Sequence, residues 1–201
     1  SGPKSVTRIV EDARGKLWLG TQAKGVVSFD PDNNIFEAID PVNLINSYLY
    51  NLWVRSLMVD QQNNLWIGTN GNGIVKYNLR TKKMAWYVHH LDKQHPAELD
   101  YTFSLFEDDK GAIWAGTYIG GLAKYDPEND NFRVISNPNN PRATVKNGVM
   151  SINQRKSGEL ILGANGGGLF IFDQKTETFL KNYKFNPVDQ NSVSDDFIGE
   201  I

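Results

Sequence analysis

A short pattern recurs four times along this chain at an almost constant interval, and no other feature constrains the fold as strongly. In its clearest form the pattern reads Gly-x-Leu-Trp-x-Gly-Thr. The tryptophan position is occupied in turn by Trp18, Trp66, Trp114 and Ile161, at steps of 48, 48 and 47 residues. Repeats of this length are units of supersecondary structure that must stack, because one unit cannot bury its apolar faces alone.

Other positions of the repeat recur with the same regularity. Eleven of the 18 glycines fall in three columns, so chance does not explain their placement. An aromatic residue follows each tryptophan position by eleven residues, and an apolar residue or threonine precedes it by twelve. This last column, which includes Val54 and Val149, begins a fifth time at Ile198 and Ile201.

The runs between these positions predict short strands joined by hairpins. They are four to six residues long, rich in β-branched and aromatic side chains, and bounded by Gly, Asn and Asp. Four strands per unit at this period predict an all-β fold: a β-propeller segment of four four-stranded antiparallel blades plus the first strand of a fifth. We expect one propeller region over residues 1–201, with the start of a fifth blade at 196–201. The four expected blades span residues 5–38, 53–87, 101–135 and 148–183.

Composition excludes several classes of function. The net charge is −2 and no basic stripe is present to neutralise phosphates, which argues against nucleic acid as a partner. Cysteine is absent, which excludes disulfides and thiol catalysis. No apolar run is long enough to cross a bilayer, so this segment is not expected to contact a membrane itself. The chain opens with Ser1 rather than methionine, which favours a processed chain or a piece of a longer one.

These residues resemble the two-component regulator propeller repeat, whose pattern is roughly V-x-x-I-x-x-D, G-x-L-W-I-G-T and G-G-L-x-x-Y-D. The second unit carries it most fully, and the third is a close copy. The segments concerned are Val54–Asp60, Leu65–Thr69, Gly73–Asn78, Gly111–Thr117 and Gly120–Asp126. The fourth unit departs most, since Ile161 replaces the tryptophan and Arg155 stands in place of an acidic residue.

The resemblance implies the periplasmic sensor region of a hybrid two-component system, of a kind common in Bacteroidetes, whose parent protein carries a histidine kinase. It implies sensing of an oligosaccharide derived from glycans, with no cofactor and no catalytic residue in this segment. Further expected partners are a second copy of the chain or the remaining blades of the parent propeller. The alternatives are a structural spacer or protein-interaction scaffold within a larger receptor, and a propeller lyase or hydrolase.

A ligand site is predicted where the second hairpin of each blade meets the links between blades, since both lie on one face of a propeller. Aromatic rings to stack on sugars and amides to bind hydroxyls gather there. The candidate ligand-binding residues are Tyr48, Tyr50, Trp53, Asn70, Asn72, Tyr101, Tyr118 and Asn165. The opposing interpretation is that these rings fill inter-blade packing and the amides satisfy tight turns.

The repeated tryptophans and the three histidines could each indicate a functional site, but both have a simpler interpretation. The recurrence of Trp18, Trp66 and Trp114 in one column predicts core packing rather than ligand contact. His89, His90 and His95 are close in sequence, but adjacent histidines on a strand point to opposite faces, so we expect no metal site. His95 could serve as a base in a lyase, although nothing at a fixed spacing supports it.

Overall fold

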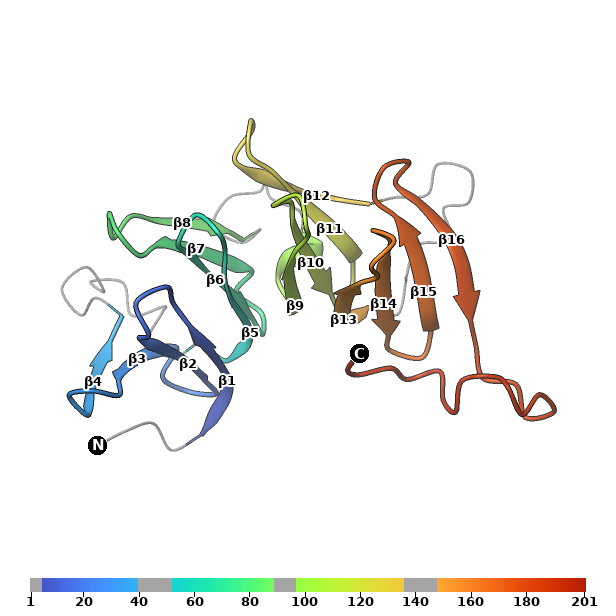
Figure 1. Cartoon of the computed structure of the whole chain (residues 1–201), viewed down its shortest axis with the longest axis horizontal. Coiled ribbons are helices and arrows are strands. Elements are labelled where there is room, and N and C mark those ends of the chain that lie inside the picture. The colour runs from blue at the N-terminus through green and yellow to red at the C-terminus, as the bar shows by residue number, and fades with distance from the viewer. Residues whose placement is uncertain (1–4, 40–51, 89–96, 136–147) are drawn as a thin grey trace.

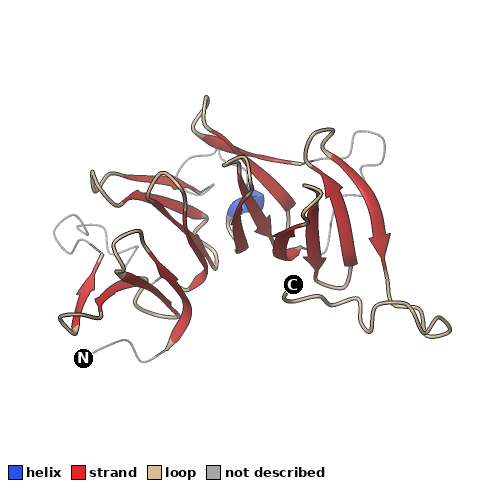
Figure 2. Ribbon diagram, in the orientation of Figure 1, coloured by secondary structure: helices blue, strands red, loops and turns tan. Residues whose placement is uncertain are grey.

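Sixteen strands form four separate antiparallel sheets in the computed structural model, which describes residues 5–39, 52–88, 97–135 and 148–201 (Figures 1 and 2). The first sheet contains β1 (Val6–Glu11), β2 (Leu17–Thr21), β3 (Val26–Asp30) and β4 (Ile35–Ala38). The second contains β5 (Val54–Val59), β6 (Asn64–Thr69), β7 (Ile74–Asn78) and β8 (Met84–Tyr87). The third contains β9 (Thr102–Glu107), β10 (Ile113–Thr117), β11 (Gly121–Asp126) and β12 (Asn131–Val134). The fourth contains β13 (Val149–Gln154), β14 (Leu160–Ala164), β15 (Gly168–Asp173) and β16 (Thr178–Tyr183). One 3₁₀ turn, η2 (Ala97–Leu99), is the helical element among the described residues.

The four sheets are blades of a propeller, which confirms the predicted fold class. Within each sheet the strands follow one another in chain order. The first strands of successive blades contact each other, β1 with β5, β5 with β9 and β9 with β13, so they form the inner side of the arrangement. Figure 1 shows the blades fanning out from these strands as an open arc.

Each inner strand carries a β-bulge near its beginning. In the second blade, Val54 pairs with Thr69 and Ser56 with Gly68, so Arg55 is the extra residue. The other three inner strands shift register at the same place. Bulges locally bend a strand and redirect a side chain, and here they do so four times at one end of the blades.

The core lies between neighbouring blades. Trp18, Trp66 and Trp114 are 4%, 1% and 0% exposed, which confirms that this column packs in the core. The tryptophan of each blade contacts an aromatic ring of the next one. The ring centroids are separated by 6.4 Å for Trp18 and Tyr77, 4.9 Å for Trp66 and Tyr125, and 5.6 Å for Trp114 and Phe172.

The glycine two residues after each tryptophan position allows the next blade to approach. A Cβ atom on Gly68 would lie 2.1 Å from the Ser56 hydroxyl oxygen and 2.8 Å from a methyl carbon of Thr102. This glycine lies within a strand, and the close packing of the next blade requires it. The equivalent contacts in the other blades join Gly20 to Val54, Gly116 to Val149 and Gly163 to Ile198.

The end of the chain follows the repeat without forming a strand. Residues 196–201 have no strand assignment, although a fifth first strand is expected there. Ile198 nevertheless packs on Gly163 and donates its backbone N–H to Ala164 O at 2.9 Å. It thus takes the position that Val149 takes on the third blade. In the four blades, the first strand pairs with the second strand of the same blade. The described part of the chain contains no second strand with which residues 196–201 could pair.

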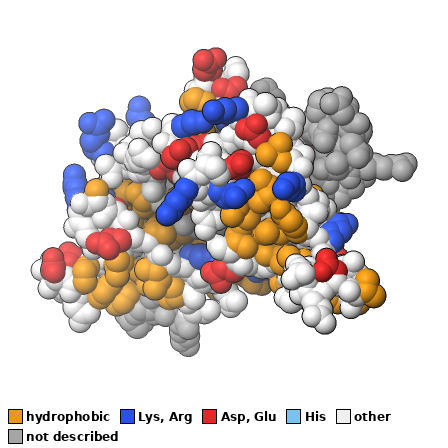
Figure 3. All heavy atoms as spheres, turned by 45° about the vertical axis from the view of Figure 1, so that its right-hand side comes forward, with side chains coloured by type: hydrophobic (Ala, Val, Ile, Leu, Met, Phe, Trp, Pro, Cys, Tyr) orange, Lys and Arg blue, Asp and Glu red, His pale blue; other side chains and the backbone are white. Residues whose placement is uncertain are grey.

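Apolar side chains are exposed at both ends of the arc. Ile9 is 59% exposed on the first blade and Leu180 is 51% exposed on the fourth. Figure 3 shows hydrophobic side chains gathering over both of these blades. Among the described residues, no helix has the length and hydropathy needed to cross a membrane.

Candidate functional site

The second hairpins and the ends of the inter-blade links lie against one another, as the geometry of a propeller predicts. The backbone N–H of Asn70 donates to Trp53 O at 2.9 Å, and that of Tyr118 donates to Tyr101 O at 2.9 Å. In the fourth blade, the N–H of Asn165 donates to Gly148 O at 3.1 Å. We call this side of the molecule the loop face.

On the loop face of the second and third blades, side chains gather around one guanidinium group. Arg55 Cζ lies 4.0 Å from the ring centroid of Trp53 and 4.8 Å from that of Phe103. Arg55 Nε donates to Asn70 Oδ1 at 3.1 Å. The ring of Phe103 lies 5.7 Å from that of Tyr118, measured between centroids.

Tyr101 extends this group from the neighbouring link. It forms an isolated antiparallel bridge with Asn70, and its ring passes close to the backbone of Gly71. Tyr101 and Tyr118 are 39% and 46% exposed, so both rings are open to solvent. We call the set Trp53, Arg55, Asn70, Tyr101, Phe103 and Tyr118 the Arg55 cluster.

Two bulges create the centre of this cluster. Arg55 and Phe103 are the extra residues of the bulges in β5 and β9, so both project at the same end of neighbouring inner strands. Burial, with a smaller contribution from the positive charge of Arg8, lowers the pKa of Arg55. Arginine remains protonated despite such a shift. Among the described residues no carboxylate forms an ion pair with Arg55, so its charge is balanced by aromatic faces and one amide oxygen.

The structure brings four of the predicted site residues together: Trp53, Asn70, Tyr101 and Tyr118. Asn72 belongs to the same hairpin as Asn70, but its backbone N–H donates to Thr69 Oγ1 at 3.0 Å as part of the turn.

The other candidates lie apart from the cluster or cannot be placed. Asn165 is on the fourth blade, away from the cluster on the second and third. Tyr48, Tyr50 and the three histidines His89, His90 and His95 lie outside the described residues. The described part of the chain contains no group of three or more His, Asp or Glu residues that could hold a metal ion.

Sequence reasoning missed Arg55 and Phe103, which form the middle of the cluster. One signal could have found them. They occupy the same position of the repeat, directly after Val54 and Thr102, where the other two blades have Thr7 and Met150. The position before it is Val or Thr in every blade, whereas this one holds Thr, Arg, Phe and Met in turn, as expected where side chains serve a local purpose.

The geometry defines the class of this protein as a β-propeller segment with an aromatic site on its loop face. The model of the two component regulator propeller family matches residues 2–23 and 47–71 of the chain. This match confirms the resemblance that the repeat pattern indicated.

Solved structures share the fold at low sequence identity. The extracellular domain of a putative hybrid two component system from B. thetaiotaomicron aligns with a TM-score of 0.75 and 21% identity, over 96% of this chain and 23% of that one. PorZ, a surface component of the type-IX secretion system of Porphyromonas gingivalis, aligns with a TM-score of 0.67 and 13% identity, over 98% of this chain and 30% of that one.

An enzyme also shares the architecture. A catalytically inactive virginiamycin B lyase from Staphylococcus aureus, solved with quinupristin, aligns with a TM-score of 0.67 and 13% identity, over 94% of this chain and 58% of that one. This chain therefore spans less than two thirds of the length of each of these proteins. No curated protein matches the sequence.

Proposed function

We propose that this chain is a non-catalytic, ligand-sensing propeller segment from the periplasmic part of a two-component signalling protein, and that it binds a glycan-derived oligosaccharide at the Arg55 cluster. The observation that carries the proposal is the stacking of Arg55 between Trp53 and Phe103, beside two exposed tyrosines. The family match and the extracellular origin of the B. thetaiotaomicron neighbour support the signalling context and the location.

The chemistry of the cluster suits sugar binding. The apolar faces of sugar rings stack on aromatic side chains, and their hydroxyl groups need fixed donors and acceptors. Tyr101 and Tyr118 offer exposed rings, while Arg55 and Asn70 hold each other in place through the 3.1 Å hydrogen bond. Because these polar groups are oriented before a ligand arrives, little ordering cost is added on binding.

Binding rather than catalysis fits the residues of the cluster. Its members are aromatic rings, an amide and a guanidinium, and the cluster contains no carboxylate, histidine or lysine to act as a general base. A general base or nucleophile would have to come from elsewhere. We expect no turnover of glycans or lactones, and an assay that detected turnover would contradict the non-catalytic assignment.

A scaffold is the second candidate function. The exposed apolar side chains on the first and fourth blades favour it, because such faces mark protein contacts. Their occupant would be a second copy of the chain or further blades of a parent propeller. In that case the outer blades would make the contacts and the Arg55 cluster would bind nothing small.

Titration calorimetry with a panel of neutral oligosaccharides separates the two functions. We expect at least one member to bind, and Tyr118→Ala to weaken that binding by about tenfold or more with unchanged folding. Tyr183→Ala is the matched control, since Tyr183 is 45% exposed on β16 and lies far from the cluster along the arc. If no member binds, or if both variants bind as the parent does, the sensing proposal is wrong and the scaffold is favoured.

A further inference from the structure

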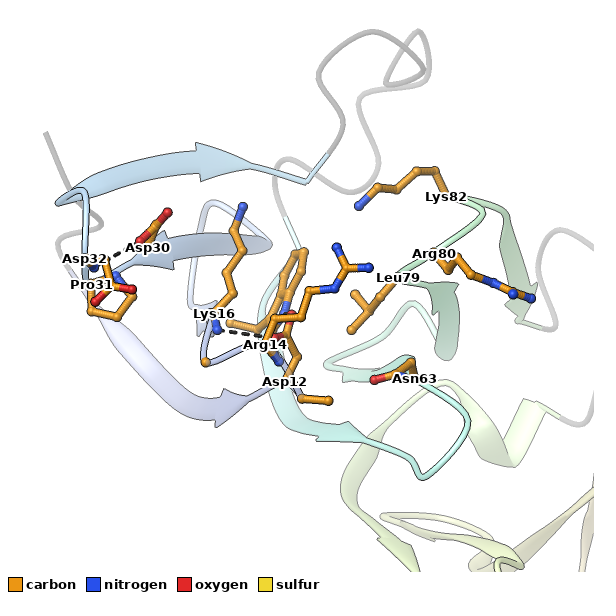
Figure 4. A pocket seen from close by; sticks show the side chains of 13 residues that line it. Asp12, Arg14, Lys16, Asp30, Pro31, Asp32, Asn63, Leu79, Arg80 and Lys82 are labelled. Atoms are coloured by element: carbon orange, nitrogen blue, oxygen red, sulfur yellow. Dashed lines mark hydrogen bonds between the residues drawn. The ribbon is translucent and has the colours of Figure 1, made fainter.

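A second hollow lies between the first and second blades, at the ends of the strands opposite to the loop face. It measures about 390 Å³ and is lined by the first and third hairpins of blade one and by residues 79–82 of blade two (Figure 4). An adjoining hollow of about 190 Å³ shares Lys16, Trp18 and Lys82 with it and reaches Tyr77. We call the combined space the Lys82 pocket.

The corresponding space is filled at the other two interfaces between blades. Lys76 lies 5.1 Å from the ring centroid of Trp66, and its Nζ donates to the hydroxyl of Tyr125 at 2.9 Å. Lys124 lies 4.9 Å from the ring centroid of Trp114. Both lysines follow their tryptophan by ten residues, and the residue at that position in the first blade is Ser28. A serine is too short to reach the face of Trp18, and in this blade it is Lys16 whose Nζ lies near that ring, 5.8 Å from its centroid.

The residue at one position of the last hairpin also changes. In the third and fourth blades, the residue with positive φ in the last hairpin is acidic: Asp130 (φ 46°) or Glu177 (φ 52°). Asp130 accepts from the hydroxyl of Tyr87 on the preceding blade at 2.7 Å, and Glu177 accepts from Lys124 at 3.4 Å. In the second blade the same position is Lys82, with φ 62°. The interface between blades one and two thus lacks both the lysine and the carboxylate.

The lining of the pocket holds four acidic and four basic side chains, and two of the basic ones extend into its open part (Figure 4). Figure 4 shows Arg14 and Lys82 extending toward the same space, while Arg80 points away from it. No carboxylate forms an ion pair with Arg14 or Lys82 in the part of the chain that the structure describes. Lys82 Nζ lies 5.6 Å from the ring centroid of Tyr77, so its charge rests beside an aromatic face.

Three acidic residues of the wall, Asp12, Asp30 and Glu37, are already engaged, and Asp32 is the fourth acidic residue that lines it. Asp12 accepts from the indole N–H of Trp18 at 2.9 Å and from two backbone N–H groups of its own hairpin. Asp30 accepts from Asn33 and Asp32 within its turn, and the Asn33 side chain is the main reason that the pKa of Asp30 is lowered. Glu37 is paired with Lys16 at 2.7 Å. Arg14 and Lys82 are therefore the charges left to receive an anion.

We propose that the Lys82 pocket binds a small ligand that carries one carboxylate on an apolar ring, such as an acidic sugar. The ligand's carboxylate lies beside Lys82 and Arg14 and supplies the negative charge that Asp130 and Glu177 supply at the neighbouring interfaces. Its ring lies in the pocket beside Leu79 and reaches only the small exposed parts of Trp18 and Tyr77, which are otherwise buried. This site is separate from the Arg55 cluster and does not depend on what binds there.

The test compares D-glucuronate with D-glucose on the whole chain. We expect glucuronate to bind about tenfold more tightly than glucose at low salt, since the two differ by one charge, and to bind more weakly as salt is added. In spectra of the tryptophan indole N–H groups, glucuronate should shift the signal of Trp18. Equal affinity for the two sugars, or no binding of glucuronate at all, overturns the proposal.

A double substitution rebuilds the pattern of the other interfaces and should close the pocket. Ser28→Lys with Lys82→Glu is expected to abolish glucuronate binding while leaving the midpoint of thermal unfolding unchanged or higher. Lys82→Ala is a smaller change that should weaken binding by about tenfold on its own. Lys175→Glu alters charge on an exposed turn of the fourth blade and should bind as the parent does. Undiminished binding by the double variant and by Lys82→Ala contradicts the proposed site.

Discussion

The indole N–H of Trp66 donates to a carboxylate oxygen of Asp60 at 2.7 Å, and both residues are buried, with 1% and 4% of their surfaces exposed. The other oxygen of Asp60 accepts the backbone N–H of Asn64 at 2.7 Å, which ties the hairpin to the strand that follows. The same pairing joins Asp12 to Trp18 and Asp108 to Trp114, each at 2.9 Å.

The fourth blade lacks both members of the pair. Arg155 stands where the aspartate would be, and Ile161 stands where the tryptophan would be. A buried indole needs an acceptor and a buried carboxylate needs donors, so losing one without the other would leave an unsatisfied polar group. The joint replacement explains why this blade departs from the repeat pattern without losing its four strands.

Removing the carboxylate of Asp60 should therefore be costly. We expect Asp60→Ala to lower the free energy of unfolding by about 3 kcal/mol, because the Trp66 indole and several N–H groups lose their acceptor in the core. Urea unfolding at pH 7 measures the change. Asp32→Ala, on an exposed turn, is the control and should change stability by less than about 0.5 kcal/mol. Equal effects of the two substitutions would refute the structural role assigned to Asp60.

Close packing of successive blades predicts the effect of a single methyl group. Gly68→Ala places a Cβ atom 2.1 Å from the Ser56 hydroxyl oxygen and 3.0 Å from a backbone oxygen of Thr102. We expect a loss of about 1–3 kcal/mol in the free energy of unfolding, as in other overpacked cores. In Gly199→Ala the nearest atom is a ring carbon of exposed Phe197 at 3.1 Å, so that variant should unfold like the parent. An unaltered unfolding midpoint for Gly68→Ala would show that the blades are packed less closely than the contacts of Gly68 indicate.

The contact between blades three and four should depend on pH. A hydrogen bond from Arg133 is the main reason that the pKa of Glu177 is lowered, with a smaller contribution from Lys124. A carboxyl group whose pKa is lower in the folded than in the unfolded chain stabilises the fold at pH values above the unfolded-state pKa. This stabilisation is lost as the pH falls through the folded-state pKa.

Glu177→Gln tests this linkage. At pH 7 the variant should be less stable than the parent by up to about 1 kcal/mol, because the partners are partly exposed to solvent. The difference should shrink toward zero as the pH is lowered from about 5 to about 2.5. Unfolding curves at several pH values measure it, and a difference that persists in acid would assign the effect to packing instead of charge.

Much of the fold can be predicted from the sequence, because the repeat is a local signal copied four times. The spacing of Trp18, Trp66 and Trp114 identifies the blades, and the glycine three residues before the tryptophan position marks the first hairpin. The reason for Gly68 could not be predicted, since it depends on Thr102 approaching from the next blade. Contacts of this kind join residues far apart in sequence and become visible only when blades are placed side by side.

The candidate site could be predicted in part. Propeller geometry directs attention to the loop face, where the structure brings Trp53, Asn70, Tyr101 and Tyr118 together, while their role in binding stays a prediction. Arg55 was missed because a bulge, which the sequence does not reveal, turns its side chain toward that face. A charged residue on an inner strand is also easily taken for a solvated side chain.

Arg55 should matter for binding and little for folding. Arg55 is half-buried and makes one side-chain hydrogen bond among the described residues, so a neutral polar side chain in its place should destabilise the blade only slightly. We expect Arg55→Gln to unfold within about 1 kcal/mol of the parent while oligosaccharide affinity falls by about tenfold. Lys110→Gln, on an exposed hairpin, serves as the control. A large loss of stability in Arg55→Gln would make the residue structural.

The location of the bound ligand is tested most directly by NMR of the five tryptophan indole N–H groups. The indoles of Trp18, Trp66 and Trp114 are held by buried or partly buried aspartates, whereas Trp53 stacks on Arg55 at the loop face. A neutral oligosaccharide that binds the chain should shift the signal of Trp53 and leave those three signals in place. Saturable binding with the Trp53 signal unmoved would contradict the Arg55 cluster as the sensing site.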